Sequence, residues 1–273
     1  MILNRIKKYL IFVKSGVQTS IAYRALVFFF IIGGLVEIVL MGLLWWAIYN
    51  FSPEPEIGGL KFPQMLMYVI LSSAIAEWTY SETFNSIAHD IRDGMIGMRL
   101  MKPVNYRAQL CFTTIGNFLG KTVLFALPVL TAGTLVAVFG FGLDGIEWYN
   151  LLLFLPAVFF ALLLEDTIAF LFGQLTFKTQ MPFGLNMLKG ILVGFLSGAF
   201  VPLALFPEWA QTVLAYTPFP SITSTPVLIF LGRLSGIEIL KAFGIAVGWI
   251  VILNIIAQLW YKATVRHVVV FGG

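Results

Sequence analysis

The sequence predicts an all-α integral membrane protein with six transmembrane helices. The composition is the first observation, because 59% of the 273 residues are hydrophobic and 11% are charged, which lies outside the usual balance of a soluble domain. The second observation is a series of apolar stretches, each close to the ~20 residues that a helix needs to cross a bilayer. These stretches are Ala25–Tyr49, Met65–Ala88, Leu119–Phe139, Leu151–Phe172, Leu188–Phe206 and Ala242–Tyr261.

The distribution of Lys and Arg gives the orientation. If Met1 lies in the cytoplasm and the six segments alternate, then Lys61, Arg233 and Lys241 fall on the outer side. The other fourteen of the seventeen basic residues fall on the inner side: Arg5, Lys7, Lys8, Lys14, Arg24, Arg92, Arg99, Lys102, Arg107, Lys121, Lys178, Lys189, Lys262 and Arg266. Positive charge collects on the cytoplasmic side of membrane proteins. We therefore expect both termini to be cytoplasmic.

The net charge of +4 has the same origin. Basic loops beside an anionic membrane face account for it, so membrane lipid is an expected partner and nucleic acid is not. Nothing outside the spans is long enough to form a second hydrophobic core, and residues 1–273 are predicted to be a single membrane domain.

The N-terminal segment has an amphipathic pattern. Apolar residues recur there at helical spacing with Lys and Arg between them: Ile2, Leu3, Ile6, Tyr9, Leu10, Val13 and Val17. This pattern predicts a helix over residues 1–20 that lies on the inner membrane surface. The alternative is a frayed basic tail whose charges only enforce the topology.

Two regions interrupt the series of simple hairpins. Residues 89–110 form a long, charged loop on the cytoplasmic side. Residues 197–226 contain five prolines, Pro202, Pro207, Pro218, Pro220 and Pro226, and the pieces between them are too short to cross ~30 Å of hydrocarbon. Non-helical backbone at membrane depth must be covered by protein or water, so we expect short re-entrant helices in the outer leaflet.

The loop at 89–110 has features of a docking element. Ile91, Met95, Met98 and Met101 lie near one face of a short helix that Pro103 would end. Gly94 and Gly97 would allow another surface to approach closely. An apolar, methionine-bearing stripe rimmed by charge is suited to binding a protein partner. The alternative is a solvated connection whose basic residues only fix the topology.

The order Ile91, Gly94, Leu100, Lys102 and Pro103 resembles the cytoplasmic loop of ABC exporter permeases of the type-two (ABC-2) export class. More narrowly, it resembles the bacterial subfamily whose permeases are encoded in pairs beside one ATPase. The outer stretch that contains 198–202, 207–209 and Pro218 also resembles a signature of the class, which lies between the last two spans.

The resemblance implies a permease subunit of the bacterial plasma (inner) membrane that forms a dimer with an identical or paralogous permease. A separate cytoplasmic ATPase would drive export. The chain has no G-x-x-x-x-G-K-[ST] motif, so ATP would be bound by the partner, and we expect no cofactor and no enzymatic activity in this chain. By analogy, the residues that couple it to the ATPase are Ile91, Arg92, Gly94, Gly97, Arg99, Leu100, Lys102 and Pro103.

Acidic residues inside the predicted spans form the second candidate site. An ionised side chain at the bilayer centre costs about 2.5–3.5 kcal/mol or more, and we expect no Lys or Arg at comparable depth. Glu37, Glu77 and Glu165 are therefore predicted to line the translocation pathway for a cationic or amphipathic solute. The alternative is structural pairing, which is favoured for two further acids: Glu82 with Lys121, and Asp166 with Lys189.

Catalytic functions have little support. The histidines, His89 and His267, fall at predicted membrane edges, and Cys111 is the single cysteine. No nucleophile elbow or metal-ligand spacing occurs, so we expect neither catalytic nor metal-binding residues. The main alternative to an ABC permease is a secondary transporter that needs no ATPase and uses the intramembrane acids as proton or cation sites.

Overall fold

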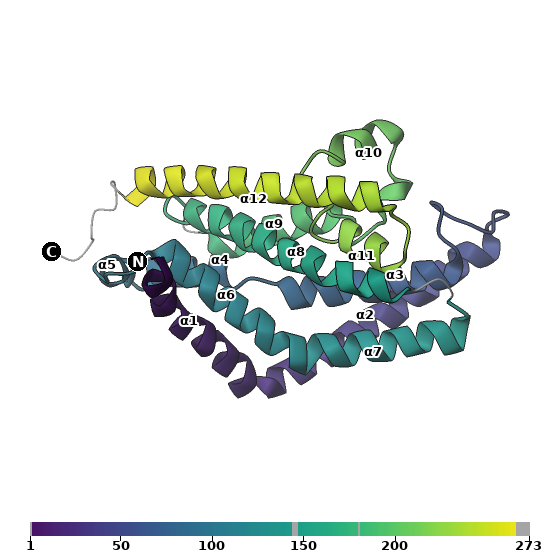
Figure 1. Ribbon diagram of the computed structural model, residues 1–273, viewed down its shortest axis with the longest axis horizontal. Coiled ribbons are helices and arrows are strands. Elements are labelled where there is room, and N and C mark those ends of the chain that lie inside the picture. Colours follow the sequence, from purple (N-terminus) through teal and green to yellow (C-terminus); the bar gives the residue numbers. More distant parts are fainter. Residues whose placement is uncertain (1, 144–146, 180, 266–273) are drawn as a thin grey trace.

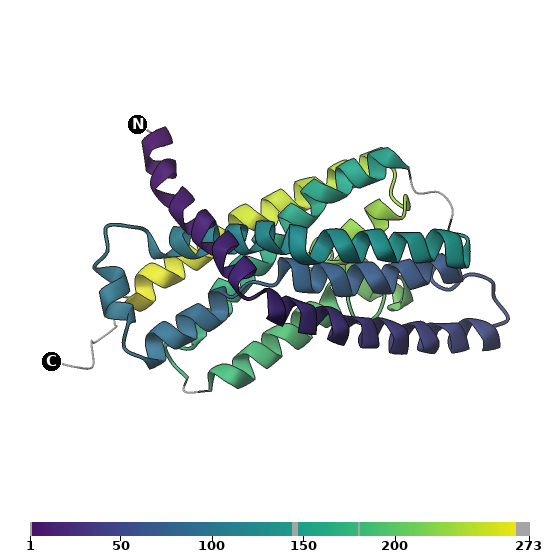
Figure 2. The same ribbon diagram turned by 90° about the horizontal axis from the view of Figure 1, so that it is seen from below.

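The computed structural model describes residues 2–143, 147–179 and 181–265, and in these ranges every regular element is a helix (Figures 1 and 2). The prediction of an all-α fold is thus confirmed for the described residues. The longer helices are α1 Ile2–Ala22, α2 Arg24–Phe51, α3 Phe62–Thr79, α4 Thr83–Arg92, α6 Tyr106–Lys121, α7 Leu127–Leu135, α8 Trp148–Leu175, α9 Pro182–Leu196 and α12 Gly236–Val265. The short ones are α5 Ile96–Leu100, α10 Glu208–Leu214, α11 Ser224–Phe230 and the 3-10 turn η3 Leu203–Leu205. Two π-helical segments, η1 Thr122–Ala126 and η2 Val136–Gly140, continue α6 and α7.

Among the described residues, four helical stretches are long and apolar enough to cross a membrane: Ile31–Phe51, Tyr106–Gly140, Trp148–Leu175 and Gly236–Thr264. They overlap the first, third, fourth and last predicted spans.

The predicted second span, Met65–Ala88, is not one continuous helix. The chain leaves α3 at Tyr80, whose φ and ψ are −53° and 124°, and re-enters helical structure at Thr83. The Ser81 hydroxyl accepts a hydrogen bond from the Thr83 amide at 3.2 Å. Serine and threonine compete with the helix in this way by bonding nearby backbone groups, so the apolar stretch is divided at a polar tetrapeptide.

The predicted fifth span, Leu188–Phe206, is also wrong in its extent. The helix there is α9, which begins at Pro182 and ends at Leu196. Gly198 adopts a left-handed conformation with φ +83°, and the Ala199 amide donates to the Gly194 carbonyl at 3.0 Å. This is the Schellman arrangement that glycine permits at a helix C-terminus.

Helix α3 lies at the centre of the bundle and is buried on most sides between Met65 and Thr79. It contacts α2, α7, α8 and α11, and its Trp78 stacks on Phe118 of α6 with ring centroids 4.9 Å apart. Because most of its surface is covered by protein, its buried polar side chains need partners within the bundle.

The helices run back and forth along the long axis of the molecule (Figure 1). The start of α1, the short helix α5 and the end of α12 lie at one end, which we call the α5 end. Helix α10 and the loop between α2 and α3 lie at the other, the α10 end.

The predicted N-terminal helix forms as α1, so residues 2–22 are not a frayed tail, and it packs closely along α6. Gly16 and Ser20 of α1 meet Gly116 and Gly120 of α6. A Cβ on Gly116 would lie 2.2 Å from the Val13 carbonyl oxygen, and one on Gly16 would lie 2.4 Å from the Thr113 oxygen. Small residues four apart let two helix backbones come this close.

The proline-rich region forms short helices at the α10 end, as predicted from their length (Figure 1). Its start is held to α3, because the Tyr68 hydroxyl donates to the Gly198 carbonyl at 2.8 Å. Its middle is held to α12 by a bond from Trp249 Nε1 to the Tyr216 carbonyl, also 2.8 Å.

Candidate functional site

The break between α3 and α4 gathers most of the polar groups inside the bundle. Lys121 at the end of α6 donates to the backbone carbonyl of Glu77 at 2.8 Å and to its Oε1 atom at 2.9 Å. The last carbonyls of a helix have no partner within it and form its negative pole. Lys121 therefore satisfies the C-terminus of α3 and neutralises Glu77 at the same time.

Asp166 of α8 accepts hydrogen bonds on the other side of the break, where α4 begins. Its Oδ1 atom accepts from the hydroxyls of Ser81, Thr83 and Thr114 at 2.8, 2.5 and 2.9 Å. Its Oδ2 atom forms an ion pair with Arg107 of α6. Asp166 is 1% exposed, and it faces the start of α4, where a helix carries partial positive charge.

Arg107 extends this network to α12. Its Nη2 atom donates to the Thr167 hydroxyl at 3.0 Å, which in turn accepts from Asn254 at 3.1 Å. The guanidinium carbon also lies 4.8 Å from the centroid of the Phe170 ring. The sequence pattern identified Arg107 only as one of the basic residues that set the topology, so this role was not predicted. Its one sequence signal is an arginine inside an otherwise helical, moderately apolar stretch.

A second buried pair joins α8 to α9. Lys189 Nζ lies 2.6 Å from Glu165 Oε1, and the two side chains are 3% and 9% exposed. Both Lys189 and Lys121 place their ammonium groups 5.4 Å from the centroid of the Tyr80 ring, so the tyrosine at the break lies between two ion pairs.

These contacts correct several expectations. Lysines do lie beside Glu77 and Glu165, contrary to the argument that made them unpaired acids. Asp166 pairs with Arg107 and not with Lys189. Glu82 does not pair with Lys121; its carboxylate accepts from Asn85 at 2.9 Å instead. The expectation that no Lys or Arg reaches the depth of these acids is wrong, because a long lysine side chain extends well beyond its own turn of the helix.

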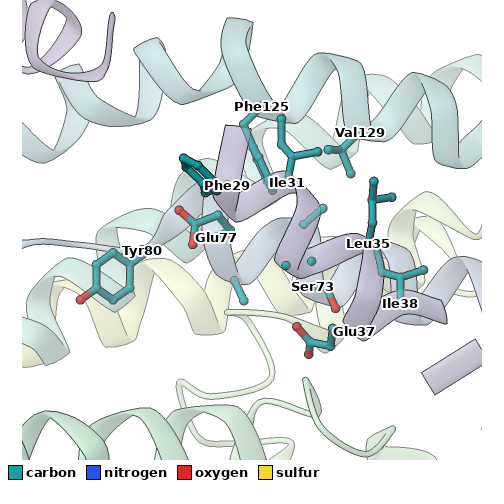
Figure 3. Close-up of a pocket in the computed structure, with 14 residues that line it drawn as sticks. Phe29, Ile31, Leu35, Glu37, Ile38, Ser73, Glu77, Tyr80, Phe125 and Val129 are labelled. Atoms are coloured by element: carbon teal, nitrogen blue, oxygen red, sulfur yellow. The ribbon is translucent and has the colours of Figure 1, made fainter. Parts of the chain in front are cut away.

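A cavity of about 420 Å³ lies between α2, α3 and the η1–α7 segment (Figure 3). Glu37 and Glu77 line it, and Glu165 is not among its lining residues. A second cavity of about 30 Å³ shares Glu37 and Ser73 and is closed by Tyr68 and Phe200. Glu37 is exposed and has no hydrogen bond or ion pair with any described residue.

The predicted docking loop is built from two helices. Gly94, with φ +68°, separates α4 from α5, so a single helix from Asp90 to Lys102 is wrong. A Cβ on Gly94 would meet no atom within 4 Å. The glycine is therefore required for backbone conformation and not for close approach by another surface.

One side of helix α5 is held against the rest of the protein by polar and apolar contacts. Buried Asp90 accepts from the Tyr106 hydroxyl at 2.8 Å and pairs with Arg99 at 3.2 Å. Ile96 is 7% exposed and packs with Ile87, Tyr106 and Phe170. Arg99 is thus paired with Asp90 within the protein, which was not predicted from the sequence.

The opposite side of this loop is open. Met95, Met98 and Met101 are 39%, 50% and 78% exposed, and we call them the methionine face. Among the other predicted coupling residues, Arg92 and Lys102 are exposed, whereas Ile91 and Gly97 are half-buried. The carbonyl of exposed Pro103 accepts from Lys8 of α1 at 3.4 Å. The side chain of Leu100, like those of Arg5 and Arg24 and the whole of Arg266 and His267, lies outside the described part of the structure.

Comparison with known proteins supports the earlier resemblance. A search of curated proteins finds no match for this chain. A family model described as ABC-2 family transporter protein matches residues 35–270, which include every helix from α3 to α12 and most of α2. The protein therefore belongs to the ABC-2 transporter family, as a membrane-spanning permease component of an ABC transporter.

Proposed function

We propose that the protein is the permease subunit of an ATP-driven exporter in the bacterial inner membrane. A separate cytoplasmic ATPase docks at the α5 end, and a second permease subunit, identical or paralogous, completes the translocation pathway. Family membership supports the transporter role, and the methionine face is the observation that carries the docking proposal.

The proposed topology has six spans. Four are the long apolar stretches, and the others are α3 continued by α4 and the shorter α9. The break at Tyr80 is compatible with membrane depth because Lys121 and Asp166 satisfy its backbone ends and hydroxyls. Helix α1 lies at the inner interface, and the region from η3 to α11 enters the outer leaflet.

The charges of the two ends support this orientation. The segment from the end of α4 to the start of α6, which carries Arg92, Arg99 and Lys102, lies at the α5 end, whereas the loop between α2 and α3, which carries Lys61, lies at the α10 end (Figure 2). Because basic residues favour the cytoplasmic side, the α5 end faces the cytoplasm.

The methionine face has the chemistry of a protein-docking surface. Methionine is flexible and polarisable and adapts to irregular partner surfaces. Exposed apolar side chains in a loop outside the membrane need a partner more than those that face lipid. Anchoring through Ile96 and Asp90 makes α5 a rigid element, which is what transmission of ATPase movement to the spans requires.

The test is co-purification of a Walker-motif ATPase with the permease from membranes. We expect Met98→Glu and Met101→Glu to reduce the recovered ATPase several-fold, because each places a charge in an apolar contact. Neither change should alter thermal stability, since both side chains are exposed. Met181→Glu is the matched control, because Met181 is 75% exposed and lies directly before α9, outside α5.

Full recovery of the ATPase with the Met98 and Met101 variants would show that α5 is only a connection. Transport by the purified chain alone, driven by a proton or cation gradient, would support the secondary-transporter alternative and contradict the ABC assignment of function.

A further inference from the structure

The cavity beside α2 has two unlike sides. Figure 3 shows Ile31, Phe125 and Val129 gathered at the top of the view and the Glu37 carboxylate at the bottom, with the Glu77 carboxylate beside Phe29 at the left. With a volume of about 420 Å³, it is large enough for a small organic molecule. A mostly apolar wall with a few polar groups is typical of such sites.

The charges that line the cavity do not cancel. Glu77 is paired with Lys121 at 2.9 Å. Lys189, which approaches Tyr80 from the side of α9, is already paired with Glu165. Glu37 has no such partner among the described residues. The lining therefore carries one uncompensated carboxylate.

Glu37 lies in an otherwise apolar part of α2, where Leu35, Val36, Val39 and Leu40 are each more than half exposed. An ionised carboxylate next to hydrocarbon is strongly disfavoured. A ligand that brings one positive charge on an apolar body would remove this cost and would cover the apolar wall. The rings of Phe29, Phe125 and Tyr80, which line the cavity, also attract an organic cation.

We propose that this cavity binds a hydrophobic organic monocation, with Glu37 as its counter-ion. The proposal rests on the proposed export function, because it names the chemical class of the solute. It also narrows the set of pathway residues, since Glu165 lies outside the cavity and Glu77 is neutralised. A dication would keep one charge uncompensated, and an anion would be repelled by Glu37.

The experiment measures equilibrium binding of radiolabelled tetraphenylphosphonium to the full chain in lipid nanodiscs, without ATPase or nucleotide. Glu37→Gln keeps the shape of the side chain and removes its charge. We expect it to weaken binding at least about tenfold, because the Coulomb attraction between the cation and one partly desolvated carboxylate is lost. Glu54→Gln is the matched control, because Glu54 is exposed in the loop after α2 and lies outside the cavity. It should bind as the unaltered protein does.

A second variant tests whether the cavity volume is needed for binding, and it leaves the charge of the cavity unchanged. Gly34 lines the cavity, and a Cβ there would meet no atom within 4 Å. Gly34→Leu should therefore keep the fold, improve helix propensity and reduce tetraphenylphosphonium binding by filling the cavity. If Glu37→Gln fails to fold, Gly34→Leu still decides whether the cavity is the site.

Tetraphenylborate, an anion of the same shape, should not bind detectably to the unaltered protein. Equal binding of both ions, or equal cation binding by the unaltered chain and Glu37→Gln, would show an apolar groove that lipid can fill and would overturn the proposal. Cation binding without any co-purifying ATPase would contradict the proposed function alone. ATPase co-purification without cation binding would contradict the present proposal alone.

Discussion

The pair of Arg107 and Asp166 illustrates what a charged residue needs inside a membrane protein. A buried ion pair gains Coulomb energy in a low dielectric but loses hydration, and the balance depends on further hydrogen bonds. Asp166 has three hydroxyl donors besides Arg107, and Arg107 reaches Thr167 as well. The pair is therefore well compensated, and it joins the start of α4 to α6, α8 and α12.

Removal of one partner should be costly. We expect Arg107→Met to destabilise the protein by about 3–5 kcal/mol, because it leaves the Asp166 carboxylate buried without its counter-charge. The double change Arg107→Met with Asp166→Asn should be more stable than Arg107→Met alone, since Asn has no charge to compensate. Thermal and denaturant unfolding of the purified chain in detergent measure both effects.

Lys121→Met provides the comparison. It breaks an ion pair whose side chains are 17% and 28% exposed, so water can replace part of the interaction and the loss should be smaller. Equal stability of the Arg107 variant and the unaltered chain would show that the network contributes nothing to the fold.

At the scale of elements, α1 and α6 approach each other most closely where glycines lie at their crossing: of the described glycines, Gly116 would bring an added Cβ nearest to another helix. Gly116 and Gly120 face Gly16 and Ser20. A side chain added at Gly16 or Gly116 would press on backbone atoms, and one added at Gly120 would press on the Ser20 side chain. A helix expected on the membrane surface is thereby held against the span that follows the docking loop. Tyr9 adds to this contact by stacking on Phe112 at 5.3 Å.

Gly116→Leu should separate the two helices. Overpacking of this kind costs about 1–3 kcal/mol, and we expect faster amide hydrogen exchange in α1 with little change in α8. Gly190→Leu is the control, because a Cβ on Gly190 meets no atom within 4 Å. Unchanged exchange in α1 would mean that the helix does not depend on this crossing.

The elements that could be predicted from the sequence were the helices whose length is set by the thickness of the bilayer. Four of the six predicted spans overlap long helices, because a run of apolar residues has few alternatives in a membrane. The break at Tyr80 was missed since the apolar pattern continues on both sides, and only Ser81 and Thr83 mark it. The end of α9 does have a sequence signal, a glycine (Gly198) followed four residues later by Pro202, and the glycine adopts the left-handed conformation that ends the helix.

The candidate site, too, was predictable from the sequence only in part. Exposure of Met98 and Met101 followed from their pattern in a polar loop. The ion pairs did not, because hydropathy gives the depth of a residue but not the direction in which a helix turns it. Glu77 and Glu37 appear equivalent in the sequence, yet a lysine from α6 reaches one of them and no described residue pairs with the other.

At the scale of the whole molecule, charge is arranged along the long axis. The middle of the bundle holds paired acids and bases, as in Glu165 with Lys189 and Asp166 with Arg107. Lys102, which pairs with no acid among the described residues, remains exposed at the α5 end, next to the methionine face. This arrangement keeps the membrane interior close to neutral and leaves the positive charge where the topology rule and the ATPase proposal both require it.

The last prediction concerns this orientation. In a Cys111→Ser background, Glu56→Cys places a thiol in the exposed loop at the α10 end, and Asp93→Cys places one in the exposed turn at the α5 end. We expect a membrane-impermeant maleimide to label position 56 in intact cells and position 93 only after the inner membrane is opened, because the basic residues of the α5 end favour the cytoplasm. Both positions are outside the helices that pack in the core, so both variants should fold. Labelling of position 93 from outside, with position 56 protected, would invert the topology. It would also remove the methionine face from the reach of any cytoplasmic ATPase.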